Sequence, residues 1–215
     1  APMLDALAAG TIMATGWDRK SPFVVPMCGS GTLAIEAALL ATDKTPGMFR
    51  MNYGFMHIIG YDEQVFFEER RKLKEKAKKE IDFRIVATDH SEDAIDISIK
   101  NAKTAGVDHL IDFSVCDFAD TEVPEAAGIV IFNPEYGERL GVHTKLEATY
   151  KRIGDFMKQK CKGYKGYIFT GNPDLAKKIG LRASRRIEFY NGKLDCRLLE
   201  YELYEGSKRE PKPES

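Results

Sequence analysis

Short apolar runs alternate along the chain with longer segments whose apolar residues recur every three or four positions. The runs predict β-strands at 22–27, 83–88, 110–115, 128–132 and 166–170. The helical spacing predicts helices at 3–16, 32–42, 91–105 and 146–161. Strands that alternate with helices in this way form a mostly parallel sheet covered on both faces. The pattern therefore predicts an α/β fold.

The C-terminal part has a different pattern. Two apolar segments, 181–190 and 194–204, are joined by Asn191-Gly192, a dipeptide typical of a tight hairpin turn. We expect this antiparallel pair to close the sheet. Because 215 residues with 43% apolar content suffice for one core, we assign residues 1–205 to a single domain. The polar segment 206–215 is expected to be a disordered tail.

Between the helix at 32–42 and the strand at 83–88 lies a segment with an unusual composition. Residues 46–61 are rich in glycine, aromatics and methionine and follow no period, whereas 63–79 is densely charged with mostly helical spacing. The basic run from Arg70 to Lys79 could contact phosphate, but charge runs on exposed helices are usually solvated faces. We therefore expect an irregular insertion followed by a solvated helix.

Charge sets a limit on how the chain could bind nucleic acid. Its 32 basic and 33 acidic residues give a net charge of -1, so no global positive field attracts a phosphate backbone. Any such binding must be local or supplied by another domain. The chain also opens with Ala1-Pro2 instead of methionine, and we interpret it as part of a longer protein.

Cysteine and histidine show no spacing typical of a metal site. No apolar run approaches the roughly 20 residues needed to span a bilayer, and the first residues lack a secretory signal. Free thiols in a reducing cytosol are the simplest interpretation. We therefore expect a cytoplasmic protein without a metal, and we assign no catalytic role to His57, His90, His109 and His143.

A glycine loop, Cys28-Gly29-Ser30-Gly31-Thr32, follows the first predicted strand and opens a helix. Small residues in this position let the backbone approach a nucleotide-like ligand. The match to G-x-G-x-x-(G/A) is weak by itself and would also admit NAD. A dinucleotide site should have a ribose-binding acid about 20 residues further on, but Asp89 follows Gly31 by 58 residues. The dinucleotide interpretation therefore fits poorly.

Two aspartates follow the next two predicted strands. Asp89 could accept hydrogen bonds from the hydroxyls of a ribose, because ligands bind at strand ends in such sheets. Asp117 could accept one from an adenine amino group in the same crevice. Each could instead serve only as a helix N-cap.

The segment Asn133-Pro134-Glu135-Tyr136 ends the fourth predicted strand. It resembles the (D/N/S)-P-P-(Y/F/W) signature of methyltransferases that act on planar amino groups. Such a site needs acceptors for the amino group and a stacking face for the ring, which Asn133, Pro134 and Tyr136 could supply. A strand followed by a proline turn is the structural alternative.

Longer motifs resemble one family, the THUMP-associated methyltransferases (UPF0020). They are Ala1-Pro-Met-Leu, Pro26-Met-Cys-Gly-Ser-Gly-Thr, Thr45-Pro-Gly-Met, Asn133-Pro-Glu-Tyr-Gly-Glu-Arg-Leu and Tyr190-Asn-Gly-Lys-Leu-Asp-Cys-Arg-Leu-Leu-Glu-Tyr. Bacterial members include RlmL, the guanine-N2 methyltransferase of large-subunit rRNA, and proteins labelled N6-DNA methylases. The resemblance implies a Rossmann-like fold with a seven-stranded sheet, S-adenosylmethionine as donor with S-adenosylhomocysteine as product, and 23S rRNA as partner. It also implies an RNA-binding THUMP domain in the full-length protein.

Together these motifs predict the residues of the site. The catalytic residues are expected to be Asn133, Pro134 and Tyr136, with a flipped-out base stacked on Tyr136. The cofactor is expected to be bound by Pro26, Cys28, Gly29, Ser30, Gly31, Thr32, Asp89, His90, Asp117 and Asn133.

Two positions depart from the family pattern. Val25 replaces an aspartate, which removes a carboxylate expected beneath the cofactor, and Glu135 replaces the second proline of the signature. Glu135 could accept a hydrogen bond from guanine N1–H or N2–H, or it could spoil the base pocket. Two other functions therefore stay open: adenine-N6 methylation of DNA, and a catalytically weakened RNA-binding pseudoenzyme.

Overall fold

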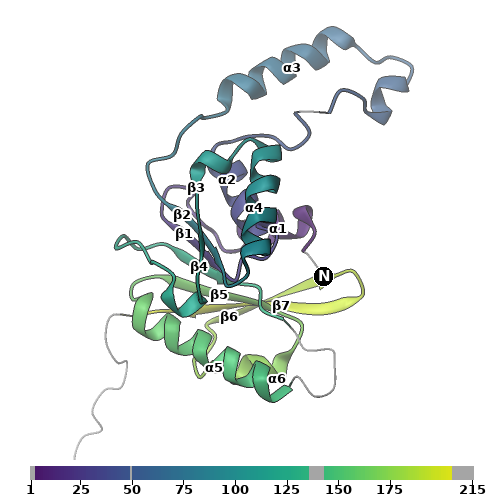
Figure 1. The fold of residues 1–215 in the computed structure, drawn as a ribbon. Helices are drawn as coiled ribbons and strands as arrows, with labels where there is room; N and C mark the ends of the chain where they lie inside the picture. The colour runs from purple at the N-terminus through teal and green to yellow at the C-terminus, as the bar shows by residue number, and fades with distance from the viewer. Residues whose placement is uncertain (1–2, 49, 136–142, 205–215) are drawn as a thin grey trace, which may run out of the picture.

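A seven-stranded sheet forms the centre of the molecule (Figure 1). The structure, a computed structural model, describes residues 3–48, 50–135 and 143–204; Tyr136 and the predicted tail 206–215 lie outside them. The strand order is β3-β2-β1-β4-β5-β7-β6. The strands are β1 (Phe23–Pro26), β2 (Ile85–Asp89), β3 (Ile111–Val115), β4 (Ile129–Phe132), β5 (Lys165–Thr170), β6 (Arg185–Asn191) and β7 (Leu194–Glu202).

The first five strands are parallel, and β7 pairs antiparallel with both β5 and β6. This arrangement confirms the predicted α/β fold with its antiparallel C-terminal hairpin. The helices are α1 (Asp5–Ala14), α2 (Thr32–Ala41), α3 (Glu63–Lys76), α4 (Glu92–Ala105), α5 (His143–Lys160) and α6 (Pro173–Lys177). Three 3-10 turns lie at Gly54–His57, Asp108–Leu110 and Phe118–Asp120.

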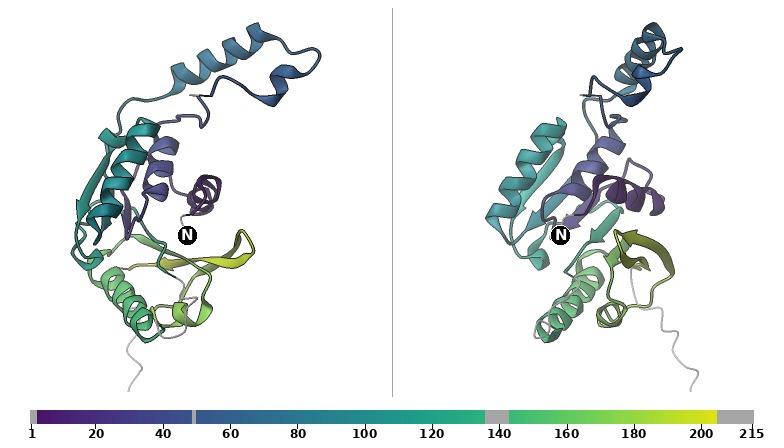
Figure 2. Two further views of the ribbon diagram at one scale, coloured as in Figure 1. Left: turned by 45° about the vertical axis from the view of Figure 1, so that its right-hand side comes forward. Right: turned by 90° about the vertical axis from the view of Figure 1, so that its right-hand side faces the viewer.

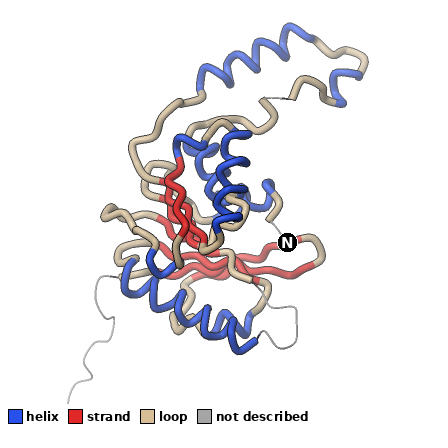
Figure 3. Tube along the Cα trace, viewed as in Figure 1, coloured by secondary structure: helices blue, strands red, loops and turns tan. Residues whose placement is uncertain are grey.

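Helices cover both faces of the sheet, as Figure 3 also shows. One core cluster joins α1, α2 and α4 to one face, and a second joins α5 and α6 to the other. Neighbouring residues of a strand alternate between them, so that Val25 belongs to the first cluster and Val24 to the second. A strand buried on both faces is apolar at nearly every position, which is why short continuous apolar runs predicted the strands.

The structure corrects several predicted boundaries. Strand β6 begins at Arg185 and not at Leu181, because its ladder with β7 starts where Ser184 N–H donates to Glu200 O. Strand β3 begins one residue later than expected, after a 3-10 turn. Helix α6 was not predicted, although Asn172 caps its N-terminus and Pro173 occupies its first turn.

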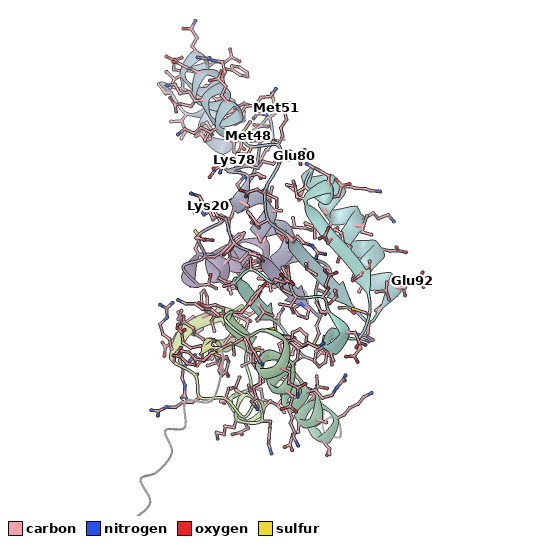
Figure 4. All side chains as sticks on the ribbon, turned by 90° about the vertical axis from the view of Figure 1, so that its left-hand side faces the viewer. Lys20, Met48, Met51, Lys78, Glu80 and Glu92 are labelled. Atoms are coloured by element: carbon pink, nitrogen blue, oxygen red, sulfur yellow. The ribbon has the colours of Figure 1, made fainter. Side chains whose placement is uncertain are left out.

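Residues 44–78, here called the arm, stand away from the sheet in the views of Figures 1 and 2. Lys78 N–H donates to Thr42 O at 2.8 Å and so returns the chain to the start of the arm. Figure 4 labels Met48 and Lys78 at this base. Helix α3 is capped by Asp62 and contains no buried residue, which confirms the predicted solvated helix. It ends at Lys76, three residues earlier than expected.

Candidate active site

The loops that carry the predicted site leave the sheet at one edge. Pro26 pairs with Thr88, and Asp89 pairs with Val115, so β1, β2 and β3 end side by side. Strand β4 lies on the other side of β1. Since the helices change from one face to the other between β1 and β4, these two strands form the switch point at which α/β sheets bind ligands.

The two glycines of the loop after β1 have different roles. Gly31 adopts φ 81° at the start of α2, and a Cβ there would lie 2.9 Å from Ser98 Oγ. Gly29 adopts φ 56°, but a Cβ there would meet nothing within 4 Å. Gly31 therefore permits close packing of α2 against α4, whereas Gly29 leaves open space beside the backbone of the loop.

Helix α4 holds the glycine loop in place. Ser98 Oγ donates to Gly29 O at 2.7 Å, and Asn101 Nδ2 donates to Ser30 O at 3.0 Å. Ser98 is fully buried. Their contacts could not be predicted from the sequence, because only the fold brings the two residues within reach of a loop about 70 positions away.

Asp89 is 8% exposed at the end of β2. Its Oδ2 accepts from Gly29 N–H at 3.0 Å, and its Oδ1 accepts from Ser91 N–H at 3.0 Å. His90 Nδ1 lies 3.2 Å from Oδ1, on a side chain that is 78% exposed. The carboxylate thus binds the glycine loop directly, while each oxygen keeps a further lone pair for a ligand hydroxyl.

Cys28 is unsuited to act as a nucleophile. Burial raises the pKa of its thiol to about 12, and the thiolate is the reactive form of cysteine. Its neighbours in the loop are small: Ser30 Oγ lies 3.2 Å from Thr32 Oγ1 at the start of α2. The loop is therefore built for binding and not for covalent catalysis.

Asp117 follows β3 at the same edge. Its Oδ1 accepts from Ala119 N–H at 2.9 Å and from Arg152 Nη2 at 2.7 Å. These contacts, with Arg152 first among them, lower the pKa of the Asp117 carboxyl. The predicted capping role is confirmed, and the role in binding adenine stays a prediction.

The segment after β4 enters the same edge. Asn133 is partly exposed, Pro134 is buried and the Glu135 side chain is exposed. Tyr150 Oη donates to Glu135 O at 3.3 Å and lies 3.0 Å from Thr170 Oγ1 at the end of β5. Burial raises the pKa of Tyr150 to about 12, so the hydroxyl keeps its proton. Tyr150 therefore links the predicted target-base segment to β5.

Two cavities flank this edge. A cavity of about 940 Å³ runs along α2 and α4 to the arm, and Glu36 lines it. A second of about 490 Å³ lies at the end of β5, between α6 and the hairpin of β6 and β7. The larger cavity leads away from the carboxyl ends of the strands, so its size does not make it the catalytic site.

The residues at the carboxyl edge fit the predicted cofactor. A nucleoside with a charged tail requires a crevice with room beside the backbone and a fixed polar group. The switch point provides the crevice, Gly29 leaves open space, and Asp89 provides a carboxylate held by the loop. All predicted cofactor residues lie at the carboxyl ends of β1 and β2 or in the segments that directly follow β1, β2, β3 and β4. Their contacts with a cofactor stay a prediction.

The cysteines and helices of the described part agree with the sequence analysis. Its cysteines are free, as predicted. Within the described ranges no helix combines the length and the apolar character that a membrane crossing requires.

The fold and the order of its loops define a Rossmann-like methyltransferase domain. The chain belongs to the UPF0020 family, whose model, described as the RMKL-like methyltransferase domain, matches residues 1–200. This match confirms the family that the sequence motifs resemble.

Individual relatives agree with this family. The ribosomal RNA large subunit methyltransferase K/L of Syntrophotalea carbinolica is 38% identical over 216 residues, which cover 95% of this chain and 30% of that protein. The solved structure of SMU.472, assigned as a methyltransferase and complexed with SAH, is 28% identical, has a TM-score of 0.88 and matches 96% of this chain with 54% of its own.

A Listeria monocytogenes structure described as a predicted N6-adenine-specific DNA methylase has a TM-score of 0.84 at 28% identity. It matches 94% of this chain with 52% of its own. The chain thus spans about a third of the K/L relative and about half of these solved chains.

Proposed function

We propose that the domain transfers a methyl group from S-adenosylmethionine to an exocyclic amino group of an RNA base, with guanine N2 of 23S rRNA as the target. The observation that carries this proposal is that Asn133-Pro134-Glu135 directly follows β4, the strand that pairs with β1, whose carboxyl end leads into the glycine loop. An amino-group methyltransferase needs its cofactor and its target base on these two neighbouring loops.

The cofactor is S-adenosylmethionine, which supplies an electrophilic methyl group; the SAH held by a solved relative supports this choice. Gly29 gives the backbone room to approach it, and Asp89 would accept from the ribose hydroxyls with its remaining lone pairs. Asp117 would accept from the adenine amino group. His90, Pro26, Ser30 and Thr32 complete the proposed walls of this crevice.

The target base would be held by the segment after β4. The side-chain carbonyl of Asn133 and the backbone carbonyl of Pro134 would accept from the amino group and so aim it at the methyl donor. Tyr136 would stack on the base, which has to leave its own stack to reach this site. No proton transfer is required before attack.

The RNA substrate is supported by the name of the K/L relative, a ribosomal RNA large subunit methyltransferase. That protein is about three times as long as this chain, so we propose that an RNA-binding domain of the THUMP type accompanies the catalytic domain in the full-length, cytoplasmic protein. Such a partner would compensate for the net charge of -1.

Adenine-N6 methylation of DNA is the competing function, because the Listeria neighbour carries that description and adenine N6 is also a conjugated amino group. Methyl transfer to unmodified 23S rRNA and to duplex DNA, followed by mass spectrometry of the nucleosides, separates the two. We expect N2-methylguanosine from the RNA. N6-methyladenosine from the DNA would refute the proposal.

Two variants test the roles within the site. Asn133→Ala should lose most turnover and keep its affinity for S-adenosylhomocysteine, because Asn133 is proposed to hold the base. Glu135→Pro restores the family signature and tests whether Glu135 contacts guanine. A loss of turnover supports that contact, whereas a gain would mean that Glu135 weakens the base pocket, as in a partly degenerate enzyme.

A further inference from the structure

The cavity of about 490 Å³ beside β5 is not used by the chemistry described above. Its size falls within the roughly 300 to 1,000 Å³ of small-molecule sites. Helix α6 and the following loop form one wall, and the strands β6 and β7 form the other. Apolar side chains, including Leu181 and Leu199, line part of it.

Positive charge is concentrated in this cavity. Its lining contains Lys177, Arg182, Arg186 and Arg197, against Asp195 as the acidic member. Arg197 is paired with Asp195 and Glu188, and Lys177 is paired with Asp174. Within the described part of the chain, the guanidinium groups of Arg182 and Arg186 have neither a hydrogen bond nor an ion pair. Two cations therefore remain available to an anionic ligand.

Tyr201 gives a second, independent indication of a ligand. Its side chain lines the cavity although the residue is only 2% exposed. Its hydroxyl has no hydrogen-bond partner among the described residues, and burial raises its pKa to about 12. The hydroxyl keeps some solvent access, so a ligand in the cavity can reach it. A proton donor thus faces a cavity that also contains the guanidinium groups of Arg182 and Arg186, which are unpaired among the residues that the structure describes.

The cavity is connected to the proposed target-base segment. Thr170 lines it at the end of β5, and Thr170 Oγ1 lies 3.0 Å from Tyr150 Oη. The same Tyr150 hydroxyl donates to Glu135 O at 3.3 Å. Two hydrogen bonds therefore separate the wall of the cavity from the segment that would hold the target base.

Guanidinium groups bind phosphate oxygens through two parallel hydrogen bonds, and a neutral hydroxyl adds one donor. An apolar wall suits a sugar or the face of a base. We propose that this cavity binds one ribonucleotide that flanks the target base in the RNA strand, with its phosphate on Arg182 and Arg186 and a hydrogen bond from Tyr201. The inference rests on the proposed function, because it takes RNA as the substrate.

The test is the binding of a fluorescently labelled single-stranded RNA that contains the target guanine, measured by anisotropy over a range of salt concentrations. The double variant Arg182→Ala/Arg186→Ala should bind at least tenfold more weakly. Its log–log salt slope should fall by about 0.7 for each lost phosphate contact. Tyr201→Phe should weaken binding severalfold without a change of slope, because the lost donor is neutral.

Lys160→Ala/Lys162→Ala is the matched control. It removes the same charge from two exposed residues just before β5, at the opposite edge of the sheet. RNA binding by this variant should stay within about twofold of the wild type. The two lysines are not expected to contact phosphate, and salt screens the attraction between distant exposed charges. All variants should bind S-adenosylhomocysteine like the wild type.

A double arginine variant that binds RNA as tightly as the wild type, or no more weakly than the lysine control, overturns the inference. Titration with guanosine monophosphate distinguishes the source of the phosphate. If the arginines are needed for the free nucleotide but not for RNA, the cavity is a nucleotide site and the inference is wrong. A wild-type chain that binds neither probe also refutes it.

The proposed function can fail separately. If RNA binding depends on the arginines but the wild type transfers no methyl group to 23S rRNA, the proposal for the cavity stands and the proposed enzymatic function is refuted. If the double arginine variant transfers the methyl group with an unchanged KM for RNA, the proposed function stands and the proposal for the cavity is refuted.

Discussion

Gly29 N–H donates to Oδ2 of Asp89 at 3.0 Å, across 60 positions of sequence. This bond joins the glycine loop after β1 to the end of β2. The other carboxylate oxygen accepts from Ser91 N–H at 3.0 Å. Both carboxylate oxygens thus accept from backbone donors, and the shape of the crevice depends on these two hydrogen bonds.

Asp89→Asn is therefore expected to weaken binding of S-adenosylhomocysteine at least tenfold. An amide can offer only one acceptor oxygen, so its NH₂ would face the N–H of Gly29 or Ser91. Leaving a buried donor unpaired costs about 1 to 3 kcal/mol, which should also lower the free energy of unfolding. Isothermal titration and urea denaturation measure the two effects.

Asp96→Asn is the control for this variant, since Asp96 is exposed on α4. It should leave both quantities unchanged. If Asp89→Asn bound the cofactor product like the wild type, the cofactor site could not lie at the end of β2.

The two glycines of the loop should respond differently to alanine. Both adopt positive φ, which costs a residue with a Cβ about 1 to 2 kcal/mol. At Gly31 the Cβ would also lie 2.9 Å from Ser98 Oγ and 3.3 Å from the Ser98 Cα. At Gly29 it would point into open space.

Gly31→Ala should therefore lower the free energy of unfolding by clearly more than Gly29→Ala does. Gly29→Ala should instead reduce the affinity for S-adenosylhomocysteine, since the methyl group would occupy the space proposed for the cofactor. Urea denaturation and calorimetric titration of the two variants check this. Equal losses of stability with equal affinities would contradict the division of roles.

Much of the fold could be predicted because its strands are buried on both faces and so read as continuous apolar runs. Leu181 is apolar because it packs against the cluster of α5 and α6, yet it lies outside β6, so the predicted strand began too early. Helix α6 has only five residues, too few to display a helical period.

Only those parts of the site whose residues are neighbours along the chain could be predicted from the sequence. The glycine loop and the segment after β4 are short motifs, and the resemblance to a family identified them. Asn101 and Arg152 act on residues 71 and 35 positions away. Nothing in their immediate neighbourhood distinguishes them from other polar residues on an exposed helical face, so only the fold reveals these contacts.

Glu36 makes stability depend on pH. It is 7% exposed on α2, and burial, with a smaller effect of Asp5, raises its pKa from 4.5 to about 7. The folded state therefore binds more protons than the unfolded state between these values, so this group costs stability as the pH rises from about 4.5 to 7. Over the whole interval the loss is about 3 kcal/mol.

Glu36→Gln keeps the shape of the side chain and removes the charge. Its free energy of unfolding should exceed that of the wild type by about 3 kcal/mol at pH 8 and by less than about 1 kcal/mol at pH 5. Urea denaturation at both pH values measures the difference. Glu92→Gln, on the exposed residue labelled in Figure 4, should show no such dependence. A constant gain at both pH values would exclude titration of Glu36 as the cause.

Tyr150 is predicted to be a positioning residue for the segment after β4. Its hydroxyl donates to Glu135 O and lies 3.0 Å from Thr170 Oγ1, so Tyr150→Phe frees the segment without touching the cofactor loops. One such hydrogen bond contributes about 1 kcal/mol, which corresponds to roughly a fivefold loss of kcat if it orients the base. The affinity for S-adenosylhomocysteine should not change.

Tyr164→Phe provides the matched comparison, because Tyr164 Oη also donates to a backbone carbonyl, that of Pro124, at 2.7 Å. Tyr164 lies just before β5, at the opposite edge of the sheet. Both variants should lose a similar amount of stability, but only Tyr150→Phe should lose kcat when assayed well below its Tm. Equal kcat values for the two variants would reduce Tyr150 to a structural role, because the catalytic segment would then keep its position without the Glu135 contact.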